Sequence, residues 1–415
     1  MSSLLLILIY YSNLVKRCYS QNVKKRQIYL DYAATAPLRK EVLRQMLPYL
    51  TEKFGNPNAL YGLGREAKQA INQARLEIAG ALRCKPGELI FTGSATEADY
   101  LALAGIAHTH APEKGKIIIS SVEHKGISSV VQQLKQEGFE VVVISVAKNG
   151  LLDLEELKKN LDAKTILVSV TMADSETGTI QPIREIARMI RNLKKVIGHK
   201  SSVISCPYFH TDATQAASYL DLNVKKLGVD LLTLSAHKLG GPKGIAALYV
   251  KKGIKLEKFH SGTENVPAIV GFGEAVKLNR QEKKAKVNIE KVKKLRNMLE
   301  REIIKIIPKV ILNGHPNRRL PNFLNISFLD IEGEAILLYL DQSGVMASTG
   351  SACDAENLKP SAVLTAMGNP YEFVHGSIRF TLGYNTTETD IKYVLKKLPV
   401  VVKKLRQISP LCLTW

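Results

Sequence analysis

The sequence predicts an α/β fold in which a mostly parallel sheet is covered by helices on both faces. Two observations predict it: short apolar runs alternate with longer amphipathic stretches, and each apolar run is continuous rather than alternating in polarity. Strands that are buried on both faces have this continuous character. An alternation of strands and helices places a ligand site at the carboxyl ends of the strands.

The elements follow in chain order. Strands are expected at residues 117–120, 141–146, 165–171, 230–235 and 245–250, and helices at 65–82, 97–108 and 182–196. A long basic helix then follows and ends at Pro308, because proline cannot continue a helix. Its apolar stripe is predicted to consist of Ile289, Val292, Leu295, Leu299, Ile303 and Ile306.

The length of 415 residues is sufficient for two domains. We expect a large domain at 27–270, with residues near 28–38 packing on the other domain, and a smaller C-terminal α/β domain at 271–415. Residues 1–26 are expected to be a presequence or an extension from an upstream start. Their apolar run is too short to span a bilayer, and basic residues without acidic ones are typical of a mitochondrial presequence. We predict a cytoplasmic protein, with the mitochondrial matrix as the alternative if residues 1–19 are a presequence.

The chain is strongly basic, with 58 Lys and Arg against 38 Asp and Glu and a net charge of +20. The basic residues are spread over helices without interleaved aromatic residues, which favours a solvated surface over stable nucleic-acid binding. Membrane association is not predicted. The five cysteines are odd in number and lack CxxC spacing, so neither a disulfide framework nor a metal site is indicated; they are Cys18, Cys84, Cys206, Cys353 and Cys412.

A lysine follows one of the apolar strands. Residues 230–244 read DLLTLSAHKLGGPKG, so the strand ends at Ser235, His237 and Lys238 before a Gly/Pro-rich turn. A lysine amine at such a position can form a Schiff base with a carbonyl compound. Most single lysines after strands are merely solvated, so Lys238 is a candidate because of the segments that accompany it.

Two upstream segments are typical of a pyridoxal phosphate site. FHTDATQA places Asp212 and Gln215 just after an apolar run, and a buried aspartate beside a pyridine nitrogen keeps the cofactor ring protonated. FTGSATEA is a strand, a small-residue turn and a helix start, which aims backbone amides at a phosphate. Alone the second segment is weak evidence, because Ser and Thr cap many helices that bind no ligand.

With these segments the chain resembles the cysteine desulfurases, the pyridoxal phosphate enzymes of the class V aminotransferase group. The resemblance extends from about Ile28 to about Val402. The segments that carry it are YLDYAATAP, FGNPNALYGLGREA, FTGSATEADYLAL, SSVEHKGI, FHTDATQA, SAHKLGGPKG, SGTENVPAIVG, RLPNFLNISF, STGSACDAENLKPSAVL and GSIRFTLG.

The resemblance implies fold type I of the pyridoxal phosphate (PLP)-dependent transferases, with a mostly parallel seven-stranded sheet in the large domain. It also implies a homodimeric sulfurtransferase that removes sulfur from L-cysteine, giving L-alanine and a persulfide on Cys353. The sulfur would serve iron–sulfur cluster assembly or tRNA thiolation through an acceptor or scaffold protein.

The resemblance also implies a role for each matching residue. Lys238 would hold the cofactor, Asp212 would pair with the ring nitrogen, Gln215 with the ring hydroxyl, and His124 would stack on the ring and act in catalysis. The implied phosphate ligands are the Ala95 amide, Thr96, Ser235, His237 and, from the neighbouring subunit, Thr263. Arg379 and Ser175 would bind the substrate. No metal is implied.

The sequence departs from the family pattern at three places. About a dozen residues are missing from the loop before Ser261. Ser175 stands where relatives carry an asparagine, and Gly240 stands where an aromatic residue is common. The shortened loop and Ser175 leave open a catalytically weakened paralogue that acts as a scaffold. A selenocysteine lyase is a separate alternative.

Overall fold

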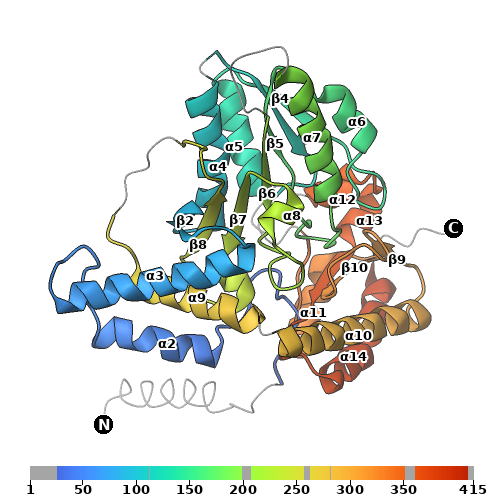
Figure 1. The fold of residues 1–415 in the computed structure, drawn as a ribbon. Coiled ribbons are helices and arrows are strands. Elements are labelled where there is room, and N and C mark those ends of the chain that lie inside the picture. Colours follow the sequence, from blue (N-terminus) through green and yellow to red (C-terminus); the bar gives the residue numbers. More distant parts are fainter. Residues whose placement is uncertain are drawn as a thin grey trace, which may run out of the picture.

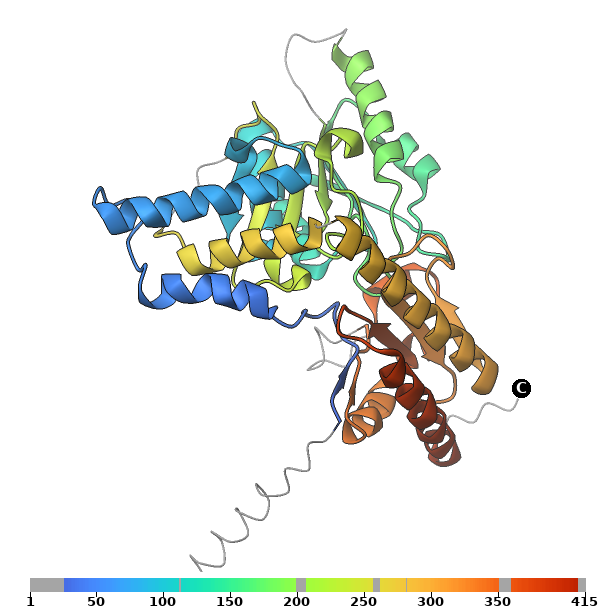
Figure 2. The ribbon, with the colours of Figure 1, turned by 60° about the horizontal axis from the view of Figure 1, so that its bottom comes forward.

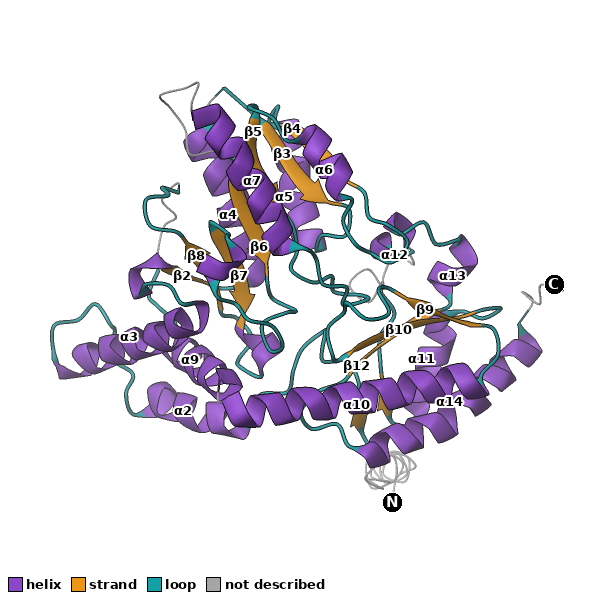
Figure 3. Cartoon of the chain, turned by 45° about the vertical axis from the view of Figure 1, so that its right-hand side comes forward, coloured by secondary structure: helices purple, strands orange, loops and turns teal. Residues whose placement is uncertain are grey.

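The continuous apolar runs form the strands of a central sheet. The computed structural model describes residues 26–111, 113–198, 207–256, 262–280, 282–350 and 360–409. Within them, seven strands form one sheet in the order β2-β8-β7-β6-β5-β3-β4 (Figures 1 and 3). They are β2 (Leu89–Thr92), β3 (Lys116–Ser120), β4 (Glu140–Ile144), β5 (Thr165–Ser169), β6 (Tyr208–Asp212), β7 (Leu231–Ser235) and β8 (Ala246–Val250). Only the pairs that involve β8 are antiparallel among these strands, which confirms the predicted α/β class.

Helices cover both faces of the sheet because its strands are apolar on both sides. In β3, Ile117 and Ile119 pack in the core formed with α4 and α5, whereas Ile118 faces the core formed with α3, α7 and α9. The bounds are α2 (Lys40–Thr51), α3 (Gly62–Leu82), α4 (Ala95–His110), α5 (Lys125–Gln136), α6 (Leu154–Asn160), α7 (Ile183–Gly198), α8 (Val224–Leu227) and α9 (Val266–Arg280). α2 and α3 both pack against α9 (Figure 2).

The C-terminal part of the chain forms a second hydrophobic core around an antiparallel sheet of order β12-β10-β9. β1 pairs in parallel with β11, so Ile28 and Leu30 from the start of the described chain lie in this second core. The elements are β1 (Ile28–Tyr29), α10 (Glu282–Ile306), β9 (Val310–Asn313), β10 (Phe323–Phe328), α11 (Gly333–Gln342), β11 (Val345–Met346), α12 (Ala362–Ala366), α13 (Tyr371–His375), β12 (Ser377–Thr381) and α14 (Glu388–Ile408).

The predicted division at residue 271 falls inside α9. The buried residues of α9, such as Phe272 and Val276, pack in the core of the large sheet. α10 begins at Glu282 and its residues Val292 and Leu299 pack in the second core. The chain thus passes from the first core to the second between α9 and α10, although Phe323 and Leu364 pack in the first core again. The division into folding domains stays a prediction.

The apolar stripe of α10 differs from the prediction at its end. Ile306 is 44% exposed, whereas Ile307 is 2% exposed. Leu299, Ile303 and Ile307 follow one another at four-residue intervals, and the Ile307 amide still bonds to the Ile303 carbonyl. Steps of four therefore keep Ile307 on the buried face, and Ile306 turns to solvent.

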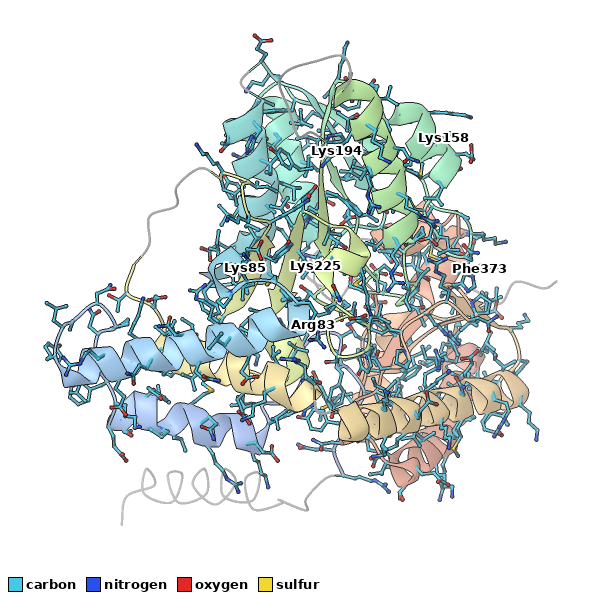
Figure 4. All side chains as sticks on the ribbon, in the orientation of Figure 1. Arg83, Lys85, Lys158, Lys194, Lys225 and Phe373 are labelled. Atoms are coloured by element: carbon cyan, nitrogen blue, oxygen red, sulfur yellow. The ribbon has the colours of Figure 1, made fainter. Side chains whose placement is uncertain are left out.

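Basic side chains are distributed over separate elements. On the face seen in Figure 4, Lys158 belongs to α6, Lys194 to α7 and Lys225 to α8, while Arg83 and Lys85 follow α3. Lys194 pairs with Asp230. Among the helices that the structure describes, none is long and apolar enough to cross a membrane.

Candidate active site

Two neighbouring strands of the central sheet deliver Lys238 and Asp212 to the same edge. β6 ends at Asp212, and β7 ends at Ser235 and continues into a 3₁₀ turn, Ala236–Leu239, that carries Lys238. Because β6 and β7 are parallel, their carboxyl ends lie together. Gly240 ends the turn with φ 78°, a left-handed conformation that favours glycine.

A cavity of about 470 Å³ lies at this edge of the sheet. Its lining brings together most of the predicted site residues, which come from five separate segments of the sequence: Ala95, Thr96, His124, Ser175, Asp212, Gln215, Ser235, His237 and Lys238. Ala34 and Thr35, from the N-terminal segment, also line it. The predicted residues Arg379 and Thr263 are outside this lining, and Cys353 lies outside the described residues.

The N-terminal segment closes the lysine side of the cavity. The Lys238 Nζ donates hydrogen bonds to the carbonyl oxygens of Ala33 and, at 2.8 Å, of Ala34. The Gln215 Nε2 donates to the same Ala33 carbonyl at 3.1 Å. Lys238 and Gln215 are thus oriented by backbone acceptors from a segment about two hundred residues away in sequence.

Asp212 lies among buried carboxyl groups. Its side chain accepts a hydrogen bond from the Thr214 amide at 2.8 Å, and only 7% of the residue is exposed. Burial raises the pKa of Asp99 and of Glu123 well above the usual range, and the nearby Asp212 charge raises both pKa values further. Both neighbours therefore favour their neutral forms. This arrangement leaves Asp212 as the group best suited to hold a protonated ring nitrogen.

Two histidines of the cavity have lowered pKa values, which favours their neutral forms. Burial, followed by the charges of Lys238 and Lys243, lowers the pKa of His237 to about 4, and its Nδ1 lies 3.1 Å from the Thr35 hydroxyl. Burial also lowers the pKa of His124, whose Nδ1 accepts from the Gly126 amide at 3.1 Å. A neutral imidazole ring can stack on a cofactor ring without a charge penalty.

The start of α4 supplies an anion-binding end to the cavity. Ser94 caps the helix and accepts from the Glu97 amide at 3.1 Å. The first amides of a helix have no partners within it and carry the positive end of the helix dipole. Ala95 and Thr96 stand at these positions, which suits a phosphate group.

The donor set of the cavity fits pyridoxal phosphate. The helix start suits the phosphate, Asp212 suits the ring nitrogen, and Lys238 suits the aldehyde. In addition, the buried Thr214 hydroxyl lines the cavity and has no hydrogen-bond partner among the described residues. A polar ligand in the cavity would satisfy such a group.

Arg379 lies beside the cavity and contacts its lining through the backbone. Its NH1 donates to the Ser175 carbonyl and its NH2 to the Asp31 carboxylate, both at 2.8 Å. The Arg379 Nε is buried and has no hydrogen-bond partner within the described part of the chain. The guanidinium is therefore oriented by two fixed acceptors and retains donor capacity for a carboxylate.

Three further predictions concern Thr263, the loop before Ser261 and Gly240. Thr263 is exposed, away from the cavity of its own chain. The loop predicted to be short ends in residues 257–261, which lie outside the described residues. At Gly240, an added Cβ would lie 2.9 Å from the Arg39 side chain, so the Arg39 side chain fills the space that a larger residue would need.

The sequence prediction did not assign roles to three residues near the site: Asp31, Thr214 and Glu176. The sequence could have marked two of them as site residues, because Thr214 lies within the FHTDATQA motif and Asp31 is the first acidic residue of the chain. No sequence pattern marks Glu176, because its contacts join segments that are distant in sequence. Among the described residues, no group of three or more His, Cys, Asp or Glu could hold a metal ion.

Known proteins are similar to this chain over nearly its whole length. The profile of the family "Aminotransferase class-V" matches residues 28–258 and 254–394. The chain is 44% identical over 401 residues to cysteine desulfurase IscS of Dictyoglomus turgidum, covering 94% of the chain and 98% of that relative.

Two solved structures are also similar. A NifS-like protein superimposes with a TM-score of 0.84 at 32% identity, over 92% of this chain and all of the other. The structure described as "SspA in complex with cysteine" has a TM-score of 0.73 at 31% identity, over 87% of this chain and all of the other.

Proposed function

The chain belongs to the class V aminotransferases and within them to the cysteine desulfurases, and from this premise we propose how its residues carry out the reaction. The enzyme removes sulfur from L-cysteine with pyridoxal phosphate, releases L-alanine and holds the sulfur as a persulfide on Cys353. The observation that carries the proposal is the gathering of Lys238, Asp212 and His124 around one cavity.

Each part of the cofactor has a matching group in the cavity. Lys238 would bind the aldehyde carbon, Asp212 the ring nitrogen and Gln215 the ring hydroxyl, with His124 against the ring face. Thr96, the Ala95 amide, Ser235 and His237 would bind the phosphate. When bound, the cofactor supplies an electron sink for the carbon skeleton of the substrate.

Arg379 would bind the carboxylate of L-cysteine. Its two contacts, to Asp31 and to the Ser175 carbonyl, fix the plane of the guanidinium, and a planar guanidinium can donate two parallel hydrogen bonds to a carboxylate. With the substrate bound, the Lys238 amine would move protons at the substrate carbons.

The sulfur step needs no further reactant. The Cys353 thiolate attacks the sulfur of the bound cysteine and forms an S–S bond, while the substrate C–S bond breaks and leaves its electron pair on the carbon skeleton. That carbon takes up a proton, and the skeleton leaves as L-alanine. Cysteine and the Cys353 thiol thus give alanine and the Cys353 persulfide, with the sulfur oxidised and the carbon reduced.

A thiol acceptor must then take the sulfur from Cys353. We assign this role to an acceptor or iron–sulfur scaffold protein, in line with the IscS relatives. The cytoplasmic location stays a prediction, because residues 1–25 lie outside the described part of the chain.

We also propose that the enzyme is a homodimer. α2 and the loop after it expose Leu43, Leu47, Leu50 and Phe54, between 41% and 70% of each residue. A cluster of apolar side chains of this kind is typical of a protein–protein interface. In the dimer the exposed Thr263 would reach the phosphate of the partner subunit. Sedimentation equilibrium of the purified protein tests the mass of the assembly.

The test of the function uses the protein purified with pyridoxal phosphate. Alanine and sulfide released from L-cysteine are measured in the presence of a thiol reductant, which regenerates the Cys353 thiol. Alanine in stoichiometric excess over enzyme is expected. Bound cofactor without alanine would contradict desulfurase turnover and favour the weakened paralogue.

A further inference from the structure

A layer of buried polar side chains lies inside the sheet, next to the cavity. Tyr208 of β6 packs in the core that α4 forms, so His210 and Asp212, which follow at intervals of two, point to the same face of the sheet. His210 is fully buried. Its Nδ1 lies 2.9 Å from the Ser169 hydroxyl of β5, and its Nε2 lies 3.1 Å from the Thr233 hydroxyl of β7. The layer thus crosses three strands directly behind Asp212, which lines the cavity.

Asp99 reaches this layer from α4, the helix that contacts β5, β6 and β7 on this face (Figure 1). It stands one turn after Ala95, and no part of it is exposed. Its Oδ1 lies 3.6 Å from the His210 Nε2. Its neighbours Ala98 and Leu103 on α4 are apolar and also fully buried. Because a carboxyl group is costly to bury among apolar side chains, Asp99 indicates a role outside the packing of the helix.

The surroundings of Asp99 favour its neutral form. Burial raises the pKa of Asp99 well above its usual range; the Asp212 and Glu123 charges raise it further, and the Thr233 hydroxyl opposes the rise. Burial also lowers the pKa of His210 to about 3, so the adjacent ring carries no charge that could hold an ionised Asp99. The negative charge of the group therefore stays on Asp212, and Asp99 keeps a proton that it can donate.

We propose that Asp99 is a positioning residue for the cofactor, which orients the Asp212 carboxylate toward the ring nitrogen of pyridoxal phosphate from the α4 side of the sheet. The inference rests on the proposed function, in which Asp212 holds that nitrogen. A neutral carboxyl group both donates and accepts hydrogen bonds, so it supports a neighbouring carboxylate without adding charge. Asparagine has the same shape and the same capacity, whereas leucine has neither donor nor acceptor. The side chain of asparagine should therefore replace Asp99, although it cannot replace the charge of Asp212.

Two variants of Asp99 test this role through cofactor affinity. Equilibrium dialysis of the cofactor-depleted protein gives the Kd of pyridoxal phosphate. We expect Asp99→Leu to raise the Kd about tenfold or more, because the charged Asp212 loses a hydrogen-bonding neighbour, and Asp99→Asn to keep it within about threefold. Leu103→Ala is the matched control for packing, since it shortens a fully buried side chain one turn further along α4. It should leave the Kd within about threefold of the wild type.

A second readout reports on the ring nitrogen directly. The protein is loaded with pyridoxal phosphate that carries ¹⁵N in the ring, and the NMR shift distinguishes a protonated from a neutral ring nitrogen. We expect a protonated nitrogen in the wild type and in Asp99→Asn. Asp99→Leu should shift toward the neutral form, in the direction of Asp212→Asn, which removes the charge itself. Leu103→Ala should match the wild type, because a loss of packing alone does not change this protonation.

Three results would overturn the inference: wild-type affinity and ring signal in Asp99→Leu, the same loss in Leu103→Ala, or a loss in Asp99→Asn as large as in Asp99→Leu. The last result would show that Asp99 acts through a charge. If Asp99→Leu does not fold, Asp99→Ala takes its place, because it adds no bulk. Both readouts are taken without L-cysteine, so they decide the inference even if the enzyme binds the cofactor and releases no alanine. A wild type that binds no cofactor would overturn the inference together with the proposed function.

Discussion

Replacing Asp31 by Asn should weaken the binding of L-cysteine, because Asp31 orients the Arg379 guanidinium. The two side chains are 2.8 Å apart and largely buried, with 17% of Asp31 and 7% of Arg379 exposed. A hydrogen bond between charged groups contributes about 1.5–3 kcal/mol, and asparagine keeps one of the acceptor oxygens. A loss of about 1–2 kcal/mol in orientation corresponds to a rise in KM of about 5- to 30-fold.

The assay is alanine release as a function of L-cysteine concentration, with kcat and KM determined separately. An interaction that acts in substrate binding and in the transition state alike changes KM and leaves kcat nearly constant. Glu388→Gln is the control, since it removes an exposed ion pair with Lys392 in the same part of the chain and should change neither value. Unchanged KM in Asp31→Asn would refute the assignment of Arg379 as the carboxylate-binding residue oriented by Asp31.

Three further variants have defined outcomes. Ser175→Asn should raise kcat/KM about 5- to 10-fold if the longer side chain adds one hydrogen bond to the substrate, as measured by alanine release; no gain would count against a deficit at this position. Burial lowers the pKa of His210 to about 3, whereas the pKa in the unfolded chain is about 6.5. As pH falls below about 6.5, only the unfolded chain takes up this proton, which favours unfolding. Its contribution to the free energy of unfolding therefore falls by on the order of 2 kcal/mol between pH 7 and pH 5, and His210→Gln should lose that part of the pH dependence in urea titrations; an identical slope would contradict it. Gly240→Ala should lower the free energy of unfolding by about 1–2 kcal/mol, because alanine disfavours φ 78° and its Cβ would meet Arg39. An unchanged midpoint of urea unfolding would contradict this.

The central sheet was predictable because its signal is local. Continuous apolar runs correspond to fully buried strands such as β3, β5 and β7. The order of the strands was not predictable from these runs, since the antiparallel pairing of β8 with both β2 and β7 depends on how the chain returns after Lys238. The end of the α10 stripe shows the same limit: Ile306 and Ile307 both fit a helical period, and packing alone decides between them.

The candidate site was predictable where short motifs carry several functional residues at once. DATQA and SAHKLGG place Asp212, Gln215 and Lys238 on the cavity wall. Contacts between distant segments were not predictable, because no local pattern encodes them. Asp31 reaches Arg379 across 348 residues, and Glu176 reaches Ser361 across 185. These contacts form only when the N-terminal segment and the second core pack beside the large sheet.

The central claim is that Cys353 receives the sulfur and that Lys238 is required for it. The most direct measurement is the intact mass of cofactor-loaded enzyme after reaction with L-cysteine without reductant, together with the alanine released. The account predicts one added sulfur atom, mapped to the Cys353 peptide, and one alanine per active site in the wild type, with neither in Cys353→Ala nor in Lys238→Ala. Full alanine release by Cys353→Ala would contradict the persulfide mechanism and indicate a lyase that releases the chalcogen directly.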